Sequence, residues 1–288
     1  MNIKKIFFIL YDLGFSLWTL SMLHKEASEA QLNELLKGEY LELQFSLGIF
    51  SNKEIELITS KNLKESTMHI EEKLQEFAKE NIKYIYFYEN SYPSKLKSIP
   101  HPPFFLFYKG QLELLEDYYS CSIVGTRKPT ENTLNEIELT VTEMVKSKII
   151  IVSGLALGTD IQAHKTTLDN EGIAVAVLPS PINEVTPKSH QHFAQKIINT
   201  GGLLISEYYK NDFKKTNYIN RNRIVSGLSN AVIIAECSEK SGTMHTARFA
   251  YKQKKPIFCF NNNSTGVRKI LSSDSAKIYT GIHNLPIE

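Results

Sequence analysis

The stretch CSIVG at residues 121–125 is a short, continuously apolar run, and a helical pattern follows it over residues 131–147. The next apolar run, IIIVSG at 149–154, is again followed by a helical pattern. The succession continues with AVAVLP (174–179), LLISEY (203–208), AVIIAEC (231–237), PIFCF (256–260) and KIY (277–279), and with helical patterns at 158–171, 188–200, about 216–229, 242–254 and 266–273. Strands without polar alternation are typical of a parallel sheet that helices cover on both faces. The sequence therefore predicts an α/β fold with a doubly wound, mostly parallel sheet.

Before the alternating pattern, the spacing of apolar residues changes near residue 80. Residues 1–80 carry apolar positions at three- to four-residue spacing, with nine Lys and Arg against thirteen Asp and Glu. From Ile82 the period changes to the aromatic, β-prone runs IKYIYFY (82–88) and FFLFYKG (104–110), joined by a segment with four prolines. We predict a small helical N-terminal domain over residues 1–80 and an extended Rossmann-like domain over residues 81–288.

Composition and charge narrow the classes of function. The chain has 42% hydrophobic and 22% charged residues, which is ordinary for a globular protein. Its formal net charge is +2, but residues 206–255 hold ten Lys and Arg against four Asp and Glu. A basic segment on a slightly acidic body indicates a localised anion site more than a general nucleic-acid coat. A solvated helix face is the alternative interpretation of the same charges.

The cysteines and the N-terminus bear on the compartment. Cys121, Cys237 and Cys259 each lie in an apolar run without metal-ligand spacing, which is typical of core residues in a reducing compartment. The N-terminal stretch begins like a signal peptide, but Asp12 interrupts its apolar run and no small-residue cleavage site follows. No uninterrupted apolar stretch approaches the ~18–20 residues of a membrane span. We expect a cytoplasmic protein without a membrane segment, whose first helix is buried.

Glycines and polar residues follow the strands at the edge where parallel sheets bind ligands. In residues 125–127, a glycine permits a tight turn and Arg127 presents a fork of donors that suits phosphate. Residues 241–243 open a predicted helix, whose N-terminal amides can bind an anion. Each group alone is also compatible with a plain strand exit or a helix cap. Together they predict an anion pocket at this edge.

Two arginines precede the strand at 231–237. Arg221 and Arg223 are two residues apart, so in an extended segment they point the same way, with Asn222 opposite. Two guanidinium groups on one side repel each other unless an anion lies between them. We therefore predict that this stretch is one wall of the anion pocket. For Asp160, at the start of another helix, we predict a capping role in preference to a catalytic one.

The motifs of common nucleotide-dependent enzymes are missing from the sequence. It has no GxGxxG after the first strand of the alternating pattern and no GxxxxGK[ST]. The candidate acid-base groups His164, His245, Glu207 and Glu236 do not form an ordered set of nucleophile, base and orienting group. We therefore predict a binding protein and not an enzyme, with no catalytic residue, no metal and no cofactor.

Six ordered motifs resemble a known family. They are YPSKLKSIPHPPFFLFYKG (92–110), SIVGTRKPT (122–130), IVSGLALGTDIQAH (151–164), GGLLISEY (201–208), NRNRIVSGLS (220–229) and SGTMHTARFA (241–250). In this order they resemble the DNA-processing protein A family (DprA, also called Smf), over about residues 82–280. The first 80 residues resemble only loosely the helical N-terminal domain of many members.

The resemblance implies sequence-independent binding and protection of single-stranded DNA, and loading of the RecA recombinase during natural transformation and DNA recombination. It also implies a homodimer through the Rossmann domain, for which we expect the interface near LLISEY and the arginine pair. A phosphate of the strand would lie among helix N-termini and guanidinium groups. The DNA- or phosphate-binding residues that the resemblance implies are Gly125, Thr126, Arg127, Ser153, Gly154, Arg221, Asn222, Arg223, Ser241, Gly242 and Thr243, with Lys188 as an addition.

The sequence also departs from the family pattern. Thr159 stands where an isoleucine is usual, and PSPINEVTPKSH (179–190) lacks the usual Gly-Leu-Asp before its proline. The sequence ends near the last predicted strand, so we expect no C-terminal winged-helix domain. The alternative function is nucleotide sensing or cleavage, as in the "lonely guy" proteins. EKSGTMHTA (239–247) has neither the Pro-Gly-Gly nor the glutamate of their motif.

Overall fold

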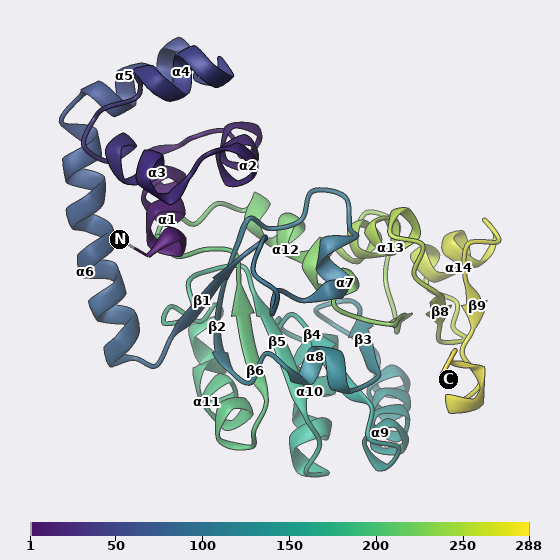
Figure 1. Ribbon diagram of the computed structural model, residues 1–288. Coiled ribbons are helices and arrows are strands. Elements are labelled where there is room, and N and C mark those ends of the chain that lie inside the picture. The colour runs from purple at the N-terminus through teal and green to yellow at the C-terminus, as the bar shows by residue number, and fades with distance from the viewer. Residues whose placement is uncertain (1, 288) are drawn as a thin grey trace. The chain divides into compact units, whose positions relative to one another are not determined.

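The first part of the chain folds into packed helices, as its apolar spacing dictates. In the computed structural model, which describes residues 2–287, these helices are α1 (Ile3–Leu13), α2 (Leu17–Glu26), α3 (Glu29–Leu35), α4 (Leu41–Leu47), α5 (Asn52–Thr59) and α6 (Asn62–Lys79) (Figure 1). The side chains from Ile6 to Leu10 are buried, and Phe8 of α1 stacks on Phe77 of α6 with 6.5 Å between the ring centroids. The apolar N-terminal stretch is thus a buried helix of this group.

Capping boxes begin two of these helices. Ser28 exchanges hydrogen bonds with Gln31 at the start of α3, and Ser51 does so with Glu54 at the start of α5. By its internal contacts the chain separates into two units, Met1–Ile82 and Lys83–Glu288. The boundary between two domains at residues 80 and 81 stays a prediction. Expression of each domain alone, to see whether it folds, would test it.

The second unit is built on one sheet. Within the described residues its nine strands have the order β1-β2-β6-β5-β4-β3-β7-β8-β9. They are β1 (Lys83–Tyr86), β2 (Phe105–Gly110), β3 (Ser120–Val124), β4 (Ile150–Ser153), β5 (Ala174–Leu178), β6 (Leu203–Ser206), β7 (Ala231–Ile234), β8 (Ile257–Cys259) and β9 (Lys277–Ile278). Strands β3 to β9 pair in parallel, and β1 and β2 add an antiparallel edge. The predicted doubly wound, mostly parallel α/β fold is confirmed.

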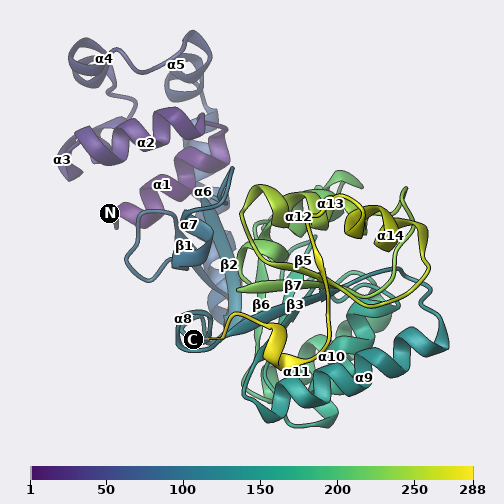
Figure 2. The same cartoon turned by 90° about the vertical axis from the view of Figure 1, so that its right-hand side faces the viewer.

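Helices cover both faces of the sheet. They are α7 (Ser94–Lys97), α8 (Leu114–Asp117), α9 (Glu131–Lys146), α10 (Thr159–Asp169), α11 (Gln191–Asn199), α12 (Thr216–Gly227), α13 (Thr243–Lys252) and α14 (Thr265–Leu271), with short 3-10 turns at Lys188–His190 and Ile282–Asn284. Figure 2 shows α12, α13 and α14 on one face and α9, α10 and α11 on the other. Val124 of β3 belongs to a buried cluster with Val225 of α12, whereas Ile123 belongs to another with Ile137 of α9. Because both faces are buried, the strands need no polar alternation.

The order of the strands reverses at β3. From β3 the chain runs through β4 and β5 to β6 on one side, and then returns to β7, which pairs with β3 on its other side. Connections after β3 and β7 leave toward opposite faces, so a crevice opens at the carboxyl ends of these two strands. The fold therefore gathers the residues that follow β3 and β7 around one opening.

Three further features concern membrane spans, cysteines and metal ligands. No helix within residues 2–287 has the length and apolarity that crossing a bilayer needs. Cys121, Cys237 and Cys259 are buried, and each carries a free thiol. The described residues contain no group of three His, Cys, Asp or Glu side chains arranged to hold a metal ion.

Candidate functional site

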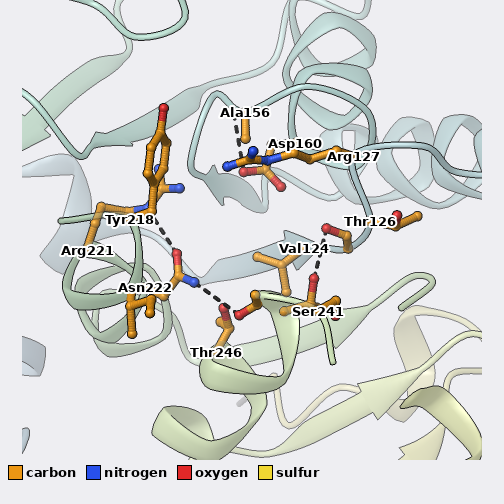
Figure 3. Close-up of a pocket in the computed structure, with 14 residues that line it drawn as sticks. Val124, Thr126, Arg127, Ala156, Asp160, Tyr218, Arg221, Asn222, Ser241 and Thr246 are labelled. Atoms are coloured by element: carbon orange, nitrogen blue, oxygen red, sulfur yellow. Dashed lines mark hydrogen bonds between the residues drawn. The ribbon is translucent and has the colours of Figure 1, made fainter. Parts of the chain in front are cut away.

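A cavity of about 420 Å³ opens at the carboxyl ends of β3 and β7, where the strand order reverses (Figure 3). Its lining residues are Val124, Gly125, Thr126, Arg127, Ala156, Asp160, Tyr218, Ile219, Arg221, Asn222, Ser241, Gly242, Thr243 and Thr246. Pockets for small organic ligands occupy about 300–1,000 Å³, whereas one water takes up only about 30 Å³ of liquid. The cavity therefore has room for a group of nucleotide size, and not only for a single phosphate.

The structure gathers most of the predicted site residues around this cavity. Those that line it are Gly125, Thr126, Arg127, Arg221, Asn222, Ser241, Gly242 and Thr243. Those that lie outside its lining are Ser153, Gly154, Lys188 and Arg223. Residues that follow the strand ends thus surround one opening, as predicted, while the binding role of each residue stays a prediction.

The turn after β3 is held in place by its backbone. The amide of Thr126 donates to the carbonyl of Glu236 at 2.7 Å, and the carbonyl of Thr126 accepts from the amide of Thr159 at 3.1 Å. Gly158 has a φ of +77°, and a Cβ atom there would collide with the backbone of Arg127. Only glycine suits both conditions. The start of α10 therefore fixes the turn from which the Arg127 side chain projects.

Arg127 lies on the exposed side of the cavity. Its guanidinium carbon is 5.1 Å from the centroid of the Tyr218 ring, a cation–π contact. Arg127 forms no ion pair within residues 2–287. Its donors therefore remain available for an anionic ligand. We define the rim of the cavity as Arg127, Tyr218, Ser241 and Gly242.

The N-terminal end of α13 completes the rim. The hydroxyl of Thr243 donates to the carbonyl of Gly125 at 2.9 Å, and this bond ties α13 to the turn after β3. The hydroxyl oxygen of Ser241 is buried and has no hydrogen-bond partner within residues 2–287. The amides of Met244 and His245 already donate to the carbonyls of Ser241 and Gly242, at 3.2 and 3.1 Å, whereas the amides of Gly242 and Thr243 have no backbone partner within residues 2–287. Amides at a helix N-terminus carry a partial positive charge. A polar or anionic group in the cavity would therefore meet donors on this side.

Arg221 forms the bottom of the cavity, and its surroundings are opposite to those of Arg127. The Arg221 residue is 4% exposed, and its Nη1 atom donates to the carbonyls of Gly154 and Val177. A Cβ atom at Gly154 would collide with this guanidinium, so glycine is required for the close approach. Asp160 and Arg221 line the cavity, and Gly154 and His164 lie behind them, outside the lining; these four residues are called the floor from here on.

Asp160 is the acidic member of the floor. Its carboxylate accepts hydrogen bonds from the amides of Gly154, at 3.2 Å, and Ala156, at 3.4 Å. Burial raises the pKa of Asp160, while Arg221 and these amides act in the opposite direction. Burial likewise lowers the pKa of Arg221, and Asp160 opposes that shift. Each charge therefore makes burial of the other tolerable.

The predicted capping role of Asp160 is wrong in its geometry. The N-cap residue of α10 is Gly158, and no side chain caps this helix. Asp160 lies in the first turn and binds amides of the loop before the helix. By accepting these hydrogen bonds, the Asp160 carboxylate holds that loop over Arg221.

His164 is a neutral member of the floor. The residue is completely buried on α10. Burial, followed by the charges of Arg221 and His190, lowers the pKa of His164 to about 3. The side chain therefore stays uncharged at neutral pH.

The Arg223 side chain does not have the position that was predicted for the arginine pair. The segment is helical in α12 and not extended, so residues two positions apart point about 200° away from each other. Arg223 binds the Glu207 carboxylate, at 2.8 Å for one of its two hydrogen bonds, and the carbonyl of His101 at 2.9 Å. The prediction that both arginines point into one pocket is therefore wrong, because Glu207 already neutralises Arg223.

Two other predicted residues have different positions from the ones expected. The Ser153 side chain is buried and donates to the carbonyl of Ile123 at 2.7 Å, so it joins β4 to β3. Lys188 is exposed at the start of a 3-10 turn and does not line the cavity. Tyr218 was missed by the sequence argument. Its position three residues before Arg221 on a helix is the signal that could have found it.

Comparison with known proteins agrees with this architecture. The family model described as DNA recombination-mediator protein A matches residues 83–287. Protein Smf from Synechocystis sp. is 32% identical over 241 residues, which cover 81% of this chain and 60% of that protein. The chain spans less than two thirds of the length of the curated relatives it matches.

Two solved structures have similar folds. DNA processing protein A from Helicobacter pylori, described for its unique single-stranded DNA binding mode, has a TM-score of 0.62 and 33% identity, covering 70% of this chain and 92% of that one. DNA processing protein A (DprA) from Streptococcus pneumoniae has a TM-score of 0.72 and 23% identity, covering 100% of both chains. The second similarity, at this identity, concerns the fold alone.

Proposed function

Because this chain belongs to the family of DNA recombination-mediator protein A, we propose that it binds single-stranded DNA without sequence preference and protects it. The observation that carries the proposal is the cavity of about 420 Å³ at the carboxyl ends of β3 and β7. It combines a free guanidinium, a helix N-terminus and an aromatic ring. These are the groups with which sequence-tolerant proteins hold a strand.

The size and lining of the cavity favour a whole nucleotide over a lone phosphate. Val124 and Ile219 supply apolar surface, and Asn222 supplies an amide. We propose that one base enters the cavity while Arg127 and the amides of α13 meet the adjacent phosphate. Arg221 would then act beneath the base as part of the floor. This revises the expectation that a phosphate lies between two arginines.

We propose a binding protein and not an enzyme. Asp160 is the one carboxylate among the described lining residues, and it is hydrogen-bonded to backbone amides beside Arg221. Both hydrogen bonds end on one oxygen of this carboxylate, and together with Arg221 they oppose the rise in pKa, and hence in basicity, that burial causes. Asp160 supports the geometry of the cavity and contacts no reacting group in this proposal.

Loading of the RecA recombinase and homodimer formation belong to the same proposal and rest on family membership. With them we propose a cytoplasmic protein that acts in DNA recombination or natural transformation. Light scattering of the purified chain tests the homodimer. Displacement of a single-strand binding protein by RecA, with and without this chain, tests loading.

Fluorescence anisotropy with a labelled (dT)20 strand, its duplex form and a salt series tests the binding proposal. We expect preference for the single strand and an affinity that falls as salt rises, because bound cations release counterions from phosphates. Equal affinity for the duplex, or binding without salt dependence, would contradict the proposal.

Nucleotide sensing is the second candidate, and the nucleotide-sized cavity favours it. A mononucleotide present at a hundred times its dissociation constant should stabilise the chain by about 2.7 kcal/mol. A thermal-shift screen of nucleotides therefore separates the two functions. Stabilisation by a mononucleotide, with no binding of (dT)20, would replace the first proposal by the second.

A further inference from the structure

The segment between β6 and α12 combines aromatic and basic side chains next to the cavity. Residues 207–215 read EYYKNDFKK. Phe213 is 40% exposed, and its ring meets that of Tyr218 at 5.3 Å between centroids with an interplanar angle of 85°. Tyr218 lines the cavity, and its ring makes a cation–π contact with Arg127. Phe213 is therefore one ring away from the cavity.

The geometry of the two rings gives each a different direction. Because the ring planes are almost perpendicular, Phe213 does not continue the plane of Tyr218. A base that leaves the cavity and turns would meet the ring of Phe213 as a separate surface. Bases stack on aromatic side chains regardless of their identity, since every base has a π-face.

The charges around Phe213 suit a strand. Lys214 and Lys215 directly follow it, are exposed, and have no ion-pair partner within residues 2–287. Glu207, at the start of the segment, is engaged by Arg223. Asp212 is the remaining acidic residue of the segment. The net charge of the side chains next to Phe213 is positive, as contacts with phosphates require.

We propose that Phe213 is a second base-stacking site, which holds the nucleotide next to the one in the cavity, with Lys214 and Lys215 meeting its phosphates. The inference rests on the proposed function and extends it from one nucleotide to at least two. In this proposal Phe213 contacts the strand directly, outside the cavity.

Substitution of Phe213 tests this proposal against a purely structural role. We expect Phe213→Ala to weaken binding of (dT)20 at least about fivefold, the lower limit of one lost stacking contact. Phe213→Leu keeps apolar packing but cannot stack, so it should weaken binding in the same way, whereas Phe213→Trp should restore it. Wild-type affinity of Phe213→Leu would overturn the proposal.

An abasic strand of the same length separates base stacking from phosphate contacts. Phe213→Ala should bind the abasic strand as the wild type does, because only its contact with a base is lost. An equal loss on the abasic strand would overturn the proposal. The control variant is Tyr118→Ala, which removes a 36% exposed aromatic ring at the opposite end of β3 and should bind both strands normally.

Fluorescence gives a direct readout of stacking. The chain contains one tryptophan, Trp18, in the first unit. In a Trp18→Phe background, the indole introduced by Phe213→Trp should be quenched by (dT)20 but not by the abasic strand. Bound (dT)20 without quenching would overturn the stacking site and leave the proposed function intact. If the wild type does not bind (dT)20 at all, the proposed function itself fails.

Discussion

Arg221 in the floor of the cavity and Arg127 on its rim both line the same opening, but their guanidinium groups have opposite surroundings. Arg221 is buried, donates to two carbonyl oxygens and lies beside Asp160. Arg127 is exposed, and its guanidinium carbon lies 5.1 Å from the centroid of the Tyr218 ring. We infer from this difference that Arg221 stabilises the site, whereas the Arg127 guanidinium is available for a ligand.

Replacement of each arginine by methionine should separate the two roles most strongly. Arg221→Met leaves the buried carbonyls of Gly154 and Val177 without this donor and removes the positive charge near Asp160, so we expect a loss of about 2–5 kcal/mol in the free energy of unfolding. Arg127→Met removes an exposed charge and should change that free energy by less than about 0.5 kcal/mol. Urea denaturation of both variants is the measurement. Similar stabilities for the two variants would break the distinction between floor and rim.

Gly154→Ala should cause the next largest effect. The added methyl collides with the Arg221 guanidinium, and such overpacking costs about 1–3 kcal/mol. In an Arg221→Met background the collision partner is a flexible thioether chain, so the same substitution should cost less. A double-mutant cycle measured by urea denaturation gives the coupling energy. Additive losses would show that the floor is not built around this contact.

Arg127→Ala should affect binding and not stability. We expect the affinity for (dT)20 to fall about tenfold, which corresponds to about 1.4 kcal/mol. The slope of log affinity against log salt should flatten by about one, because one phosphate contact is lost. The matched control is Lys128→Ala, which removes a neighbouring exposed charge outside the cavity lining. Equal effects of the two substitutions would reduce Arg127 to a general surface charge.

The floor should also make stability depend on pH through His164. The folded chain keeps His164 neutral down to about pH 3, whereas the unfolded chain takes up a proton near pH 6.5. The contribution of His164 to the free energy of unfolding is therefore full well above pH 6.5 and is lost on acidification, by about 1 kcal/mol between pH 7 and 5.5. Urea denaturation at several pH values, compared with His164→Gln, measures this contribution.

The His164→Gln variant should keep part of the pH dependence. Burial also lowers the pKa of His24 in the first unit, and this histidine acts in the same direction. The prediction therefore concerns the difference in slope between wild type and variant. An unchanged slope in His164→Gln would mean that His164 is not buried as a neutral group.

The sequence predicted the fold well because hydrophobic patterning carries most of the information about it. Continuous apolar runs such as that at 121–125 can be satisfied only by burial on both faces, and this gives the doubly wound sheet. Residues 125–127 and 241–243 could also be predicted as neighbours, because the carboxyl ends of parallel strands share one edge.

The sequence could not separate the roles of the arginines. Arg221 and Arg223 look equivalent in the sequence, but the helical rotation of α12 turns one toward Gly154 and the other toward Glu207. Glu207 and His101 are distant in sequence from the helix that they hold, so no local pattern indicates them. The partners and the exposure of a side chain depend on tertiary packing. The sequence alone therefore could not predict that Arg221 is buried and Arg127 exposed.

The most direct test of the central claim, that a nucleotide of the strand occupies this cavity, is the affinity of Gly242→Val for (dT)20. Gly242 lines the cavity, and a Cβ atom there meets no protein atom within 4 Å, so the variant should fold with unchanged stability. We predict a folded protein whose binding of (dT)20 is reduced at least tenfold. Wild-type affinity in a folded Gly242→Val protein would show that the strand does not enter the cavity.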